Sequence, residues 1–233
     1  MRIWILAEVP VSLFGDELDV GYQAYSVLKT GIDYSGNFLP VHFHSLAEWR
    51  TPLYLYASVP TVALFGISPW GVRLPAAIFG ILGVLFLYLL VSELLTTRNP
   101  STSVRLRSLQ ALRASTTRNY ALPLIAAFLL AISPWHIQYS RAGFEVTQML
   151  ALFLAGLWLF FKAVPISGGK ADGKWLPLSA ACLVLTPLVY STAKLFTPII
   201  ILTLVLIWGK ELLKISKKWL LWSLAVGVII GTP

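Results

Sequence analysis

The stretch RLPAAIFGILGVLFLYLLVSE, from Arg73 to Glu93, decides the fold of this chain. A helix needs about 20 mainly apolar residues to cross a hydrocarbon core of about 30 Å, and this stretch supplies them. Further apolar runs follow, several of them shorter than about 20 residues. The expected spans lie near residues 73–93, 119–137, 145–163, 175–191, 195–209 and 219–233. The sequence therefore predicts an all-α fold, a polytopic transmembrane helix bundle over residues 73–233.

The composition agrees with an integral membrane protein. Hydrophobic residues make up 57% of the 233 residues and charged residues 12%, about half the charge of an ordinary soluble domain. The mean hydropathy is +0.76. The formal charge of +8 does not indicate nucleic acid, because the basic residues gather in short loops between apolar runs. Cys182 is the single cysteine, so an intrachain disulfide is excluded.

The basic loops predict the orientation of the bundle. Loop 94–118 carries five arginines and the positive-inside rule assigns it to the cytoplasm. Alternation then assigns the lysines near 162–174 and 210–218 to the same side. The loops near 138–144 and 191–194, and everything before Arg73, are expected outside. The residues expected to share this outer face are Asp16, Glu17, Arg141, Glu145 and Lys194.

Residues 1–72 are predicted to form an extracytoplasmic loop with juxtamembrane helices. An amphipathic helix is expected from Glu17 to Thr30, ended by Gly31 and followed by a turn-rich loop. The apolar run from Pro52 to Gly66 is short and contains Pro60, so we expect it to lie in the membrane interface. Nearby tyrosines and tryptophans are the side chains that favour this depth.

Two charged pairs are candidates for chemistry. Asp16 and Glu17 lie at the start of the first helix, where acids also serve as ordinary helix caps. Arg141 and Glu145 are spaced i and i+4 between apolar runs, a spacing that also suits a plain helical salt bridge. Ionisable residues at the rim of a bundle are costly unless they meet water, each other or a ligand, which favours function for this second pair.

Other polar residues carry weaker signals. Lys194 lies between two apolar runs and can hold a phosphate as a point charge, or extend to the interface. His42 and His44 alternate as on a strand, but two histidines make a weak metal site, and we expect an interfacial role. His136 is expected to be structural.

These motifs together resemble the GT-C membrane glycosyltransferases, in particular family 39, which includes protein O-mannosyltransferases and lipid A aminoarabinose transferases. The joint order of the blocks is specific to that family and covers nearly the whole chain. The blocks are Gly15-Asp16-Glu17, Gly21 to Ser26, Thr30-Gly31, Leu39-Pro40, Thr51-Pro52-Leu53-Tyr54, Arg73-Leu74-Pro75-Ala76, Ser133-Pro134-Trp135-His136, Ser140-Arg141 with Glu145, and Tyr190 to Pro198.

The resemblance implies an enzyme that moves a sugar from a polyprenyl-phosphate donor to a hydroxyl acceptor on a glycan, lipid or protein. The reaction would invert the anomeric carbon at the extracytoplasmic face of the cell or inner membrane. Asp16 matches the catalytic general base and Glu17 its catalytic neighbour. The substrate-binding candidates are Arg141, Glu145, Lys194, Tyr22 and Tyr54. No metal ligand and no certain cofactor are implied, and a divalent metal ion stays an open alternative.

Two departures from the family weigh on this expectation. The family's first spanning helix should precede Asp16, and further helices should follow Pro233, so the chain is expected to be an incomplete fragment. A non-catalytic membrane scaffold or a degenerate fragment is the alternative function. A lipid-linked sugar flippase or transporter is a weaker alternative, because the charges cluster at the rims and not at the midplane.

Overall fold

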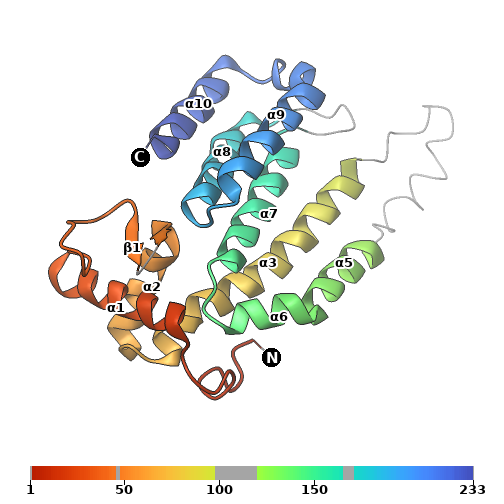
Figure 1. The fold of residues 1–233 in the computed structure, drawn as a ribbon. Coiled ribbons are helices and arrows are strands. Elements are labelled where there is room, and N and C mark those ends of the chain that lie inside the picture. The colour runs from red at the N-terminus through yellow and green to blue at the C-terminus, as the bar shows by residue number, and fades with distance from the viewer. Residues whose placement is uncertain (1, 46–47, 98–119, 165–170, 233) are drawn as a thin grey trace, which may run out of the picture.

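The computed structural model describes residues 2–45, 48–97, 120–164 and 171–232, and these residues are mostly helical (Figure 1). The amino-terminal elements are α1 (Gly15–Thr30), β1 (Phe43–Ser45), β2 (Glu48–Arg50) and α2 (Pro52–Phe65). The bundle consists of α3 (Pro69–Thr97), α5 (Ala121–Ile132), α6 (Pro134–Arg141), α7 (Val146–Ala163), α8 (Leu176–Leu185), α9 (Ala193–Leu212) and α10 (Lys217–Gly231). Short 3-10 turns at Gly173–Trp175 and Thr186–Leu188 flank α8.

The expected first helix is confirmed, and the strands correct the all-α prediction. Helix α1 ends where Gly31 adopts φ +73°, a left-handed conformation that glycine reaches without strain. Strands β1 and β2 form an antiparallel hairpin in which His44 lies opposite Trp49. The two rings meet edge to face with centroids 5.0 Å apart, which supports an ordinary structural role for this histidine.

Helix α2 runs from Pro52 to Phe65 without a break at Pro60. A proline inside a helix leaves the carbonyl four residues earlier without its donor. Pro60 is on the exposed side of α2, where such a carbonyl can still meet solvent.

Three helices in the described ranges are long and apolar enough to cross a membrane, namely α3, α7 and α9. The expected span at 119–137 is instead two helices, α5 and α6, bent by 57° at Ser133. Pro134 begins α6 and cannot donate a helical hydrogen bond backwards, which explains the break. The expected spans near 175–191 and 219–233 correspond to shorter helices, α8 with its flanking turns and α10.

The bend between α5 and α6 contacts Arg2, which is distant from it in the sequence. The guanidinium of Arg2 donates to the carbonyls of Leu130 and Ala131, at 3.4 and 3.2 Å. It also lies 2.7 Å from Nδ1 of His136, whose side chain is fully buried. The expected structural role of His136 is therefore confirmed.

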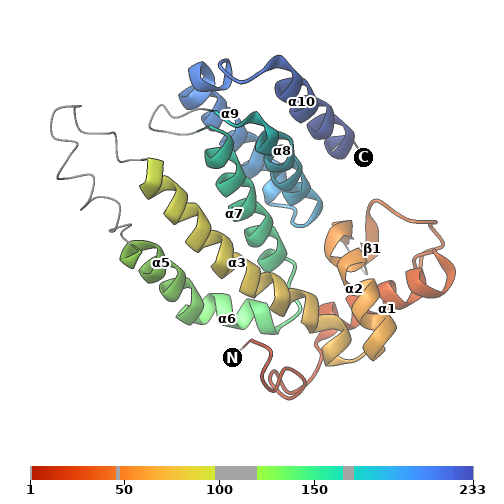
Figure 2. The same cartoon turned by 180° about the vertical axis from the view of Figure 1, so that it is seen from behind.

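Helix α3 lies at the centre of the bundle, between α7 on one side and α5 and α6 on the other (Figure 2). Helix α7 packs in turn on α8, and α8 on α10. A core of buried aliphatic and aromatic residues, including Leu154, Phe160 and Leu183, joins these helices. A second core, around Val20 and Leu55, joins α1 and α2 to the start of α3. The amino-terminal elements are thus packed firmly onto one end of the bundle.

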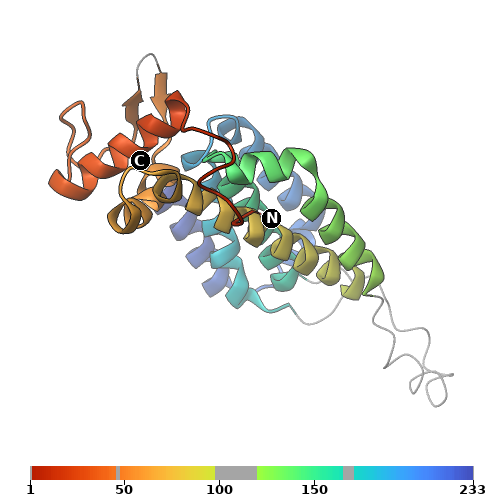
Figure 3. The same ribbon diagram turned by 90° about the horizontal axis from the view of Figure 1, so that it is seen from below.

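The amino-terminal elements and the described helix ends that lead to the arginine loop lie at opposite ends of α3. Helices α1 and α2 gather at one end of α3, away from the ends of α3 and α5 that lead to residues 98–119 (Figure 3). At that other end, the ammonium of Lys162 lies 3.9 Å from the ring centre of Trp175 and 4.9 Å from that of Trp158. Lysines beside tryptophans are typical of a membrane interface. The arginine loop and Lys170 lie outside the described residues.

Candidate functional site

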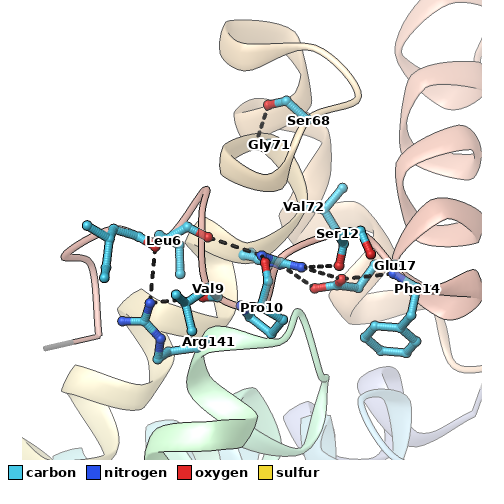
Figure 4. A network of polar contacts seen from close by, with 12 residues as sticks. Leu6, Val9, Pro10, Ser12, Phe14, Glu17, Ser68, Gly71, Val72 and Arg141 are labelled. Atoms are coloured by element: carbon cyan, nitrogen blue, oxygen red, sulfur yellow. Dashed lines mark hydrogen bonds and ion pairs between the residues drawn. The ribbon is translucent and has the colours of Figure 1, made fainter.

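The most buried charges of the described residues are Arg73 and Glu17, and both are fully shielded from solvent. Figure 4 shows Glu17 and its surroundings. Their two parallel contacts measure 2.7 Å from Nε to Oε1 and 2.9 Å from Nη2 to Oε2. A bidentate pair of this kind is the strongest ordinary contact between an arginine and a carboxylate. Glu17 also accepts a hydrogen bond from the backbone N–H of Phe14, so the capping interpretation holds for this residue.

Arg73 also holds the chain that precedes α1. Its remaining N–H groups donate to the carbonyls of Leu6, Pro10 and Ser12, so all five donors of the guanidinium are used. The sequence analysis named Arg73 only as a boundary. The sequence did offer a signal for Arg73. An arginine at the start of an apolar helix needs a partner to be tolerated there.

Arg141 acts on the same segment. It is nearly buried, and it donates to the carbonyls of Trp4, Ile5 and Val9 at 2.9 to 3.1 Å. Figure 4 shows Arg141 beside Val9. These contacts give Arg141 a positioning role and correct the expectation that its side chain is available to substrate.

Asp16, the other member of the acidic pair, points to solvent. Its side chain is 55% exposed and pairs with Arg50 at 2.5 Å. Asp19, one helical turn further on, lies 3.3 Å from the same guanidinium, and its side chain is only 8% exposed. Arg50 ends strand β2, so the hairpin carries it across to α1. The sequence analysis missed Arg50 and Asp19, since nothing local shows that a hairpin returns to the helix.

Arg50 also lines a polar cavity of about 360 Å³ with Glu145, Tyr139 and Tyr190. The cavity lies between β2, the start of α7 and the turn before α9. Thr51 fixes this turn, because its buried hydroxyl donates to the carbonyl of Val189 at 2.6 Å. Arg50 therefore connects two of the predicted site residues, because it pairs with Asp16 and lines the same cavity as Glu145.

The tyrosines and Lys194 have separate locations. Tyr54 is 2% exposed and donates to the carbonyl of Val72 at 2.9 Å, which corrects its expected role in substrate binding. Burial first, and then the charges of Glu145 and Glu17, raise the pKa of Tyr54 well above 10. Tyr22 is exposed on α1. Lys194 is exposed at the start of α9 and lines another cavity, of about 460 Å³.

Within the described ranges, no cluster of three or more His, Cys, Asp or Glu side chains is placed to hold a metal ion. Asp16 and Asp19 both face Arg50, so a cation there would compete with the guanidinium.

The residues that the structure describes form a mostly helical fold, with three helices of membrane-spanning length among them and a polar cavity at one end of the bundle. No family model matches the chain, and no curated protein or solved structure matches it either.

Proposed function

We propose that this chain belongs to a membrane glycosyltransferase that transfers a sugar from a polyprenyl-phosphate donor to a hydroxyl acceptor. The observation that carries the proposal is the Asp16–Arg50 pair beside the cavity that contains Glu145. An exposed carboxylate oriented by a guanidinium is a suitable general base, because it combines access to substrate with a fixed direction. The motif resemblance supplies the reaction class.

In the proposed reaction, the acceptor oxygen attacks the anomeric carbon through an oxocarbenium-like transition state. The carbon–oxygen bond to the phosphate breaks, its electron pair leaves with the phosphate, and the acceptor proton passes to Asp16. Attack from the face opposite the phosphate inverts the anomeric carbon. The products are the glycosylated acceptor and a polyprenyl phosphate.

The remaining residues receive roles that fit their surroundings. Lys194 is the exposed cation that can stabilise the departing phosphate, whereas Arg141 positions the amino-terminal segment. Glu145 is assigned to the orientation of the acceptor or of Arg50. Glu17 acts through Arg73 by fixing the start of α1, so it is a positioning residue and not a second base.

The test is transfer of labelled sugar by protein reconstituted in liposomes with a polyprenyl-phosphate sugar. Asp16→Asn is expected to lower the rate about 10²- to 10⁴-fold, as loss of a general base does. Asp172→Asn is the matched control, because Asp172 is another exposed acid in an ion pair, with Lys174, and is not part of the cavity.

Equal, measurable rates for Asp16→Asn and wild type would contradict the proposed base, whereas no transfer by wild type would favour a non-catalytic scaffold. A variant that folds, binds donor and transfers no sugar would support the assignment. Asp16→Glu is expected to recover part of the rate, because it keeps the carboxylate.

A further inference from the structure

A groove of about 450 Å³ lies between α8, α9 and α10, and neither the sequence analysis nor the proposed reaction assigns it. Helix α10 turns one face to this groove, because its lining residues recur at every third or fourth position. Two of them, Gly227 and Gly231, have no side chain and leave room beside Val184 of α8. A Cβ atom added at these glycines would lie 3.9 and 3.2 Å from Val184.

The lining of the groove suits a hydrocarbon chain. Most of its side chains are aliphatic, and the hydroxyls of Ser179 and Ser223 are among the exceptions. Ser179 donates to the carbonyl of Gly156 at 2.8 Å, and Ser223 donates to that of Trp219 at 2.7 Å. Because both hydroxyl hydrogens are used inside the protein, a polar ligand would lose its water here without gaining these donors.

The length of the groove matches one leaflet of a bilayer. Its lining on α10 extends from Leu220 to Gly231. At 1.5 Å per residue, this stretch of helix rises by about 16 Å. Half of a hydrocarbon core of about 30 Å is about 15 Å. An acyl chain of one leaflet can therefore lie along the whole groove.

One end of the groove is strongly basic. Leu176, Leu212 and Leu220 form this end, and exposed lysines lie within a few residues of them. The lysines are Lys174, Lys210, Lys214, Lys217 and Lys218. The acids of residues 146–232 are Asp172 and Glu211, and they pair with Lys174 and Lys214. Positive charge thus remains in excess where the headgroup of a lipid would lie, and such clusters attract anionic headgroups.

We infer that this groove holds an anionic phospholipid of the adjoining leaflet, with its phosphate beside Lys217 and Lys218 and one acyl chain along α10. The apolar lining, its length and the basic end each match one part of such a lipid. The inference does not depend on the proposed transferase function.

The isoprenoid tail of a sugar donor is the competing occupant. The other end of the groove shares Val184, Ile201 and Gly231 with the cavity that Lys194 lines. A lipid held from that end would place its phosphate near Lys194. Among the described residues, that cavity has one lysine in its lining, whereas five exposed lysines surround the opposite end. The distribution of charge therefore favours the phospholipid.

Native mass spectrometry of the purified protein measures the binding of phosphatidylglycerol and of phosphatidylcholine with the same acyl chains. We expect one phosphatidylglycerol to stay bound under conditions that remove phosphatidylcholine. The double variant Lys217→Gln/Lys218→Gln is expected to weaken phosphatidylglycerol binding about tenfold, because each lysine contributes to attraction of the headgroup. Lys29→Gln is the matched control, since Lys29 is an exposed lysine on α1.

A second pair of variants tests the position of the acyl chain. Gly227→Leu fills the groove and is expected to lower retention of phosphatidylglycerol. Gly209→Leu is its control, because Gly209 does not line the groove and a Cβ atom there meets nothing within 4 Å. If Gly227→Leu does not fold, as judged by circular dichroism, Ala180→Leu fills the same groove from α8.

Four outcomes would overturn the inference. Equal retention of the two lipids, or equal weakening by the double lysine variant and Lys29→Gln, would exclude the headgroup site. Retention that the groove-filling variant leaves unchanged would exclude the acyl chain from the groove. Binding that Lys194→Gln weakens and the double lysine variant does not, with displacement by a polyprenyl phosphate, would assign the groove to the donor. A lipid-free dimer that Gly227→Leu converts to monomer would make a second copy of the chain the occupant.

Discussion

Removing the charge of Glu17 tests how much its buried pair with Arg73 stabilises the packing of the amino-terminal segment. The pair with Arg73 has both side chains at zero exposure, with contacts of 2.7 and 2.9 Å. Breaking a buried pair by removing one partner typically costs about 3–5 kcal/mol, because the other charge stays buried without compensation. Two charge-assisted hydrogen bonds at about 1.5–3 kcal/mol each give a similar figure. We therefore expect Glu17→Gln to destabilise the protein by about 3–5 kcal/mol.

The assay is reversible unfolding in mixed micelles with increasing denaturing detergent, followed by circular dichroism. Glu17→Gln, Arg73→Met and the double variant form a thermodynamic cycle, and the coupling between the two sites is expected to be large because the residues are in direct contact. The double variant is expected to be less damaged than the sum of the singles, since no unpaired charge is left inside.

The matched control is Lys174→Met, which breaks an ion pair with Asp172 that is exposed on both sides. Exposed pairs contribute little to stability, so this variant should unfold like wild type. If Glu17→Gln unfolds at the same detergent concentration as Lys174→Met, the buried pair does not hold the amino-terminal segment. The positioning role of Glu17 is then wrong.

Two further variants probe backbone packing and ionisation in the same region. Gly71→Ala would place a Cβ atom 2.2 Å from the carbonyl oxygen of Gly66, so we expect a loss of about 1–3 kcal/mol in the same assay, while Gly83→Ala, with 3.5 Å of room, should stay near wild type. Tyr54→Phe should cost about 1 kcal/mol near neutral pH, through loss of the hydrogen bond to Val72. Because the folded-state pKa of Tyr54 is raised, its contribution is present below pH 10 and is lost at higher pH, so the difference between the two proteins should shrink there. A difference that grows with pH would contradict this sign.

Local sequence signals predicted the beginning and end of several elements. Gly31 ends α1 and Pro52 begins α2, because one residue tolerates a left-handed turn and the other fits the first helical turn. The long apolar run after Arg73 predicted α3, which begins four residues earlier, at Pro69. The position of each such helix can be predicted because the period and length of an apolar run are properties of a single segment.

Contacts between distant segments could not be predicted in this way. Arg50 and Asp16 are 34 positions apart and meet only because the hairpin returns to α1. Arg73 and Arg141 resemble ordinary rim charges in the sequence, yet both donate to carbonyls of the first twelve residues. These carbonyls are backbone atoms, so the residue types of the first twelve positions do not reveal them as partners. The acidic pair was therefore located correctly on α1, but the different surroundings of its two members were not foreseen.

The contact between Arg2 and the bend of α5 and α6 has a practical consequence. The shape of residues 121–141 is determined by Pro134 and also by a guanidinium that lies 128 positions away from Leu130. A change that displaces the side chain of Arg2 is thus expected to act on this bend as a core substitution would.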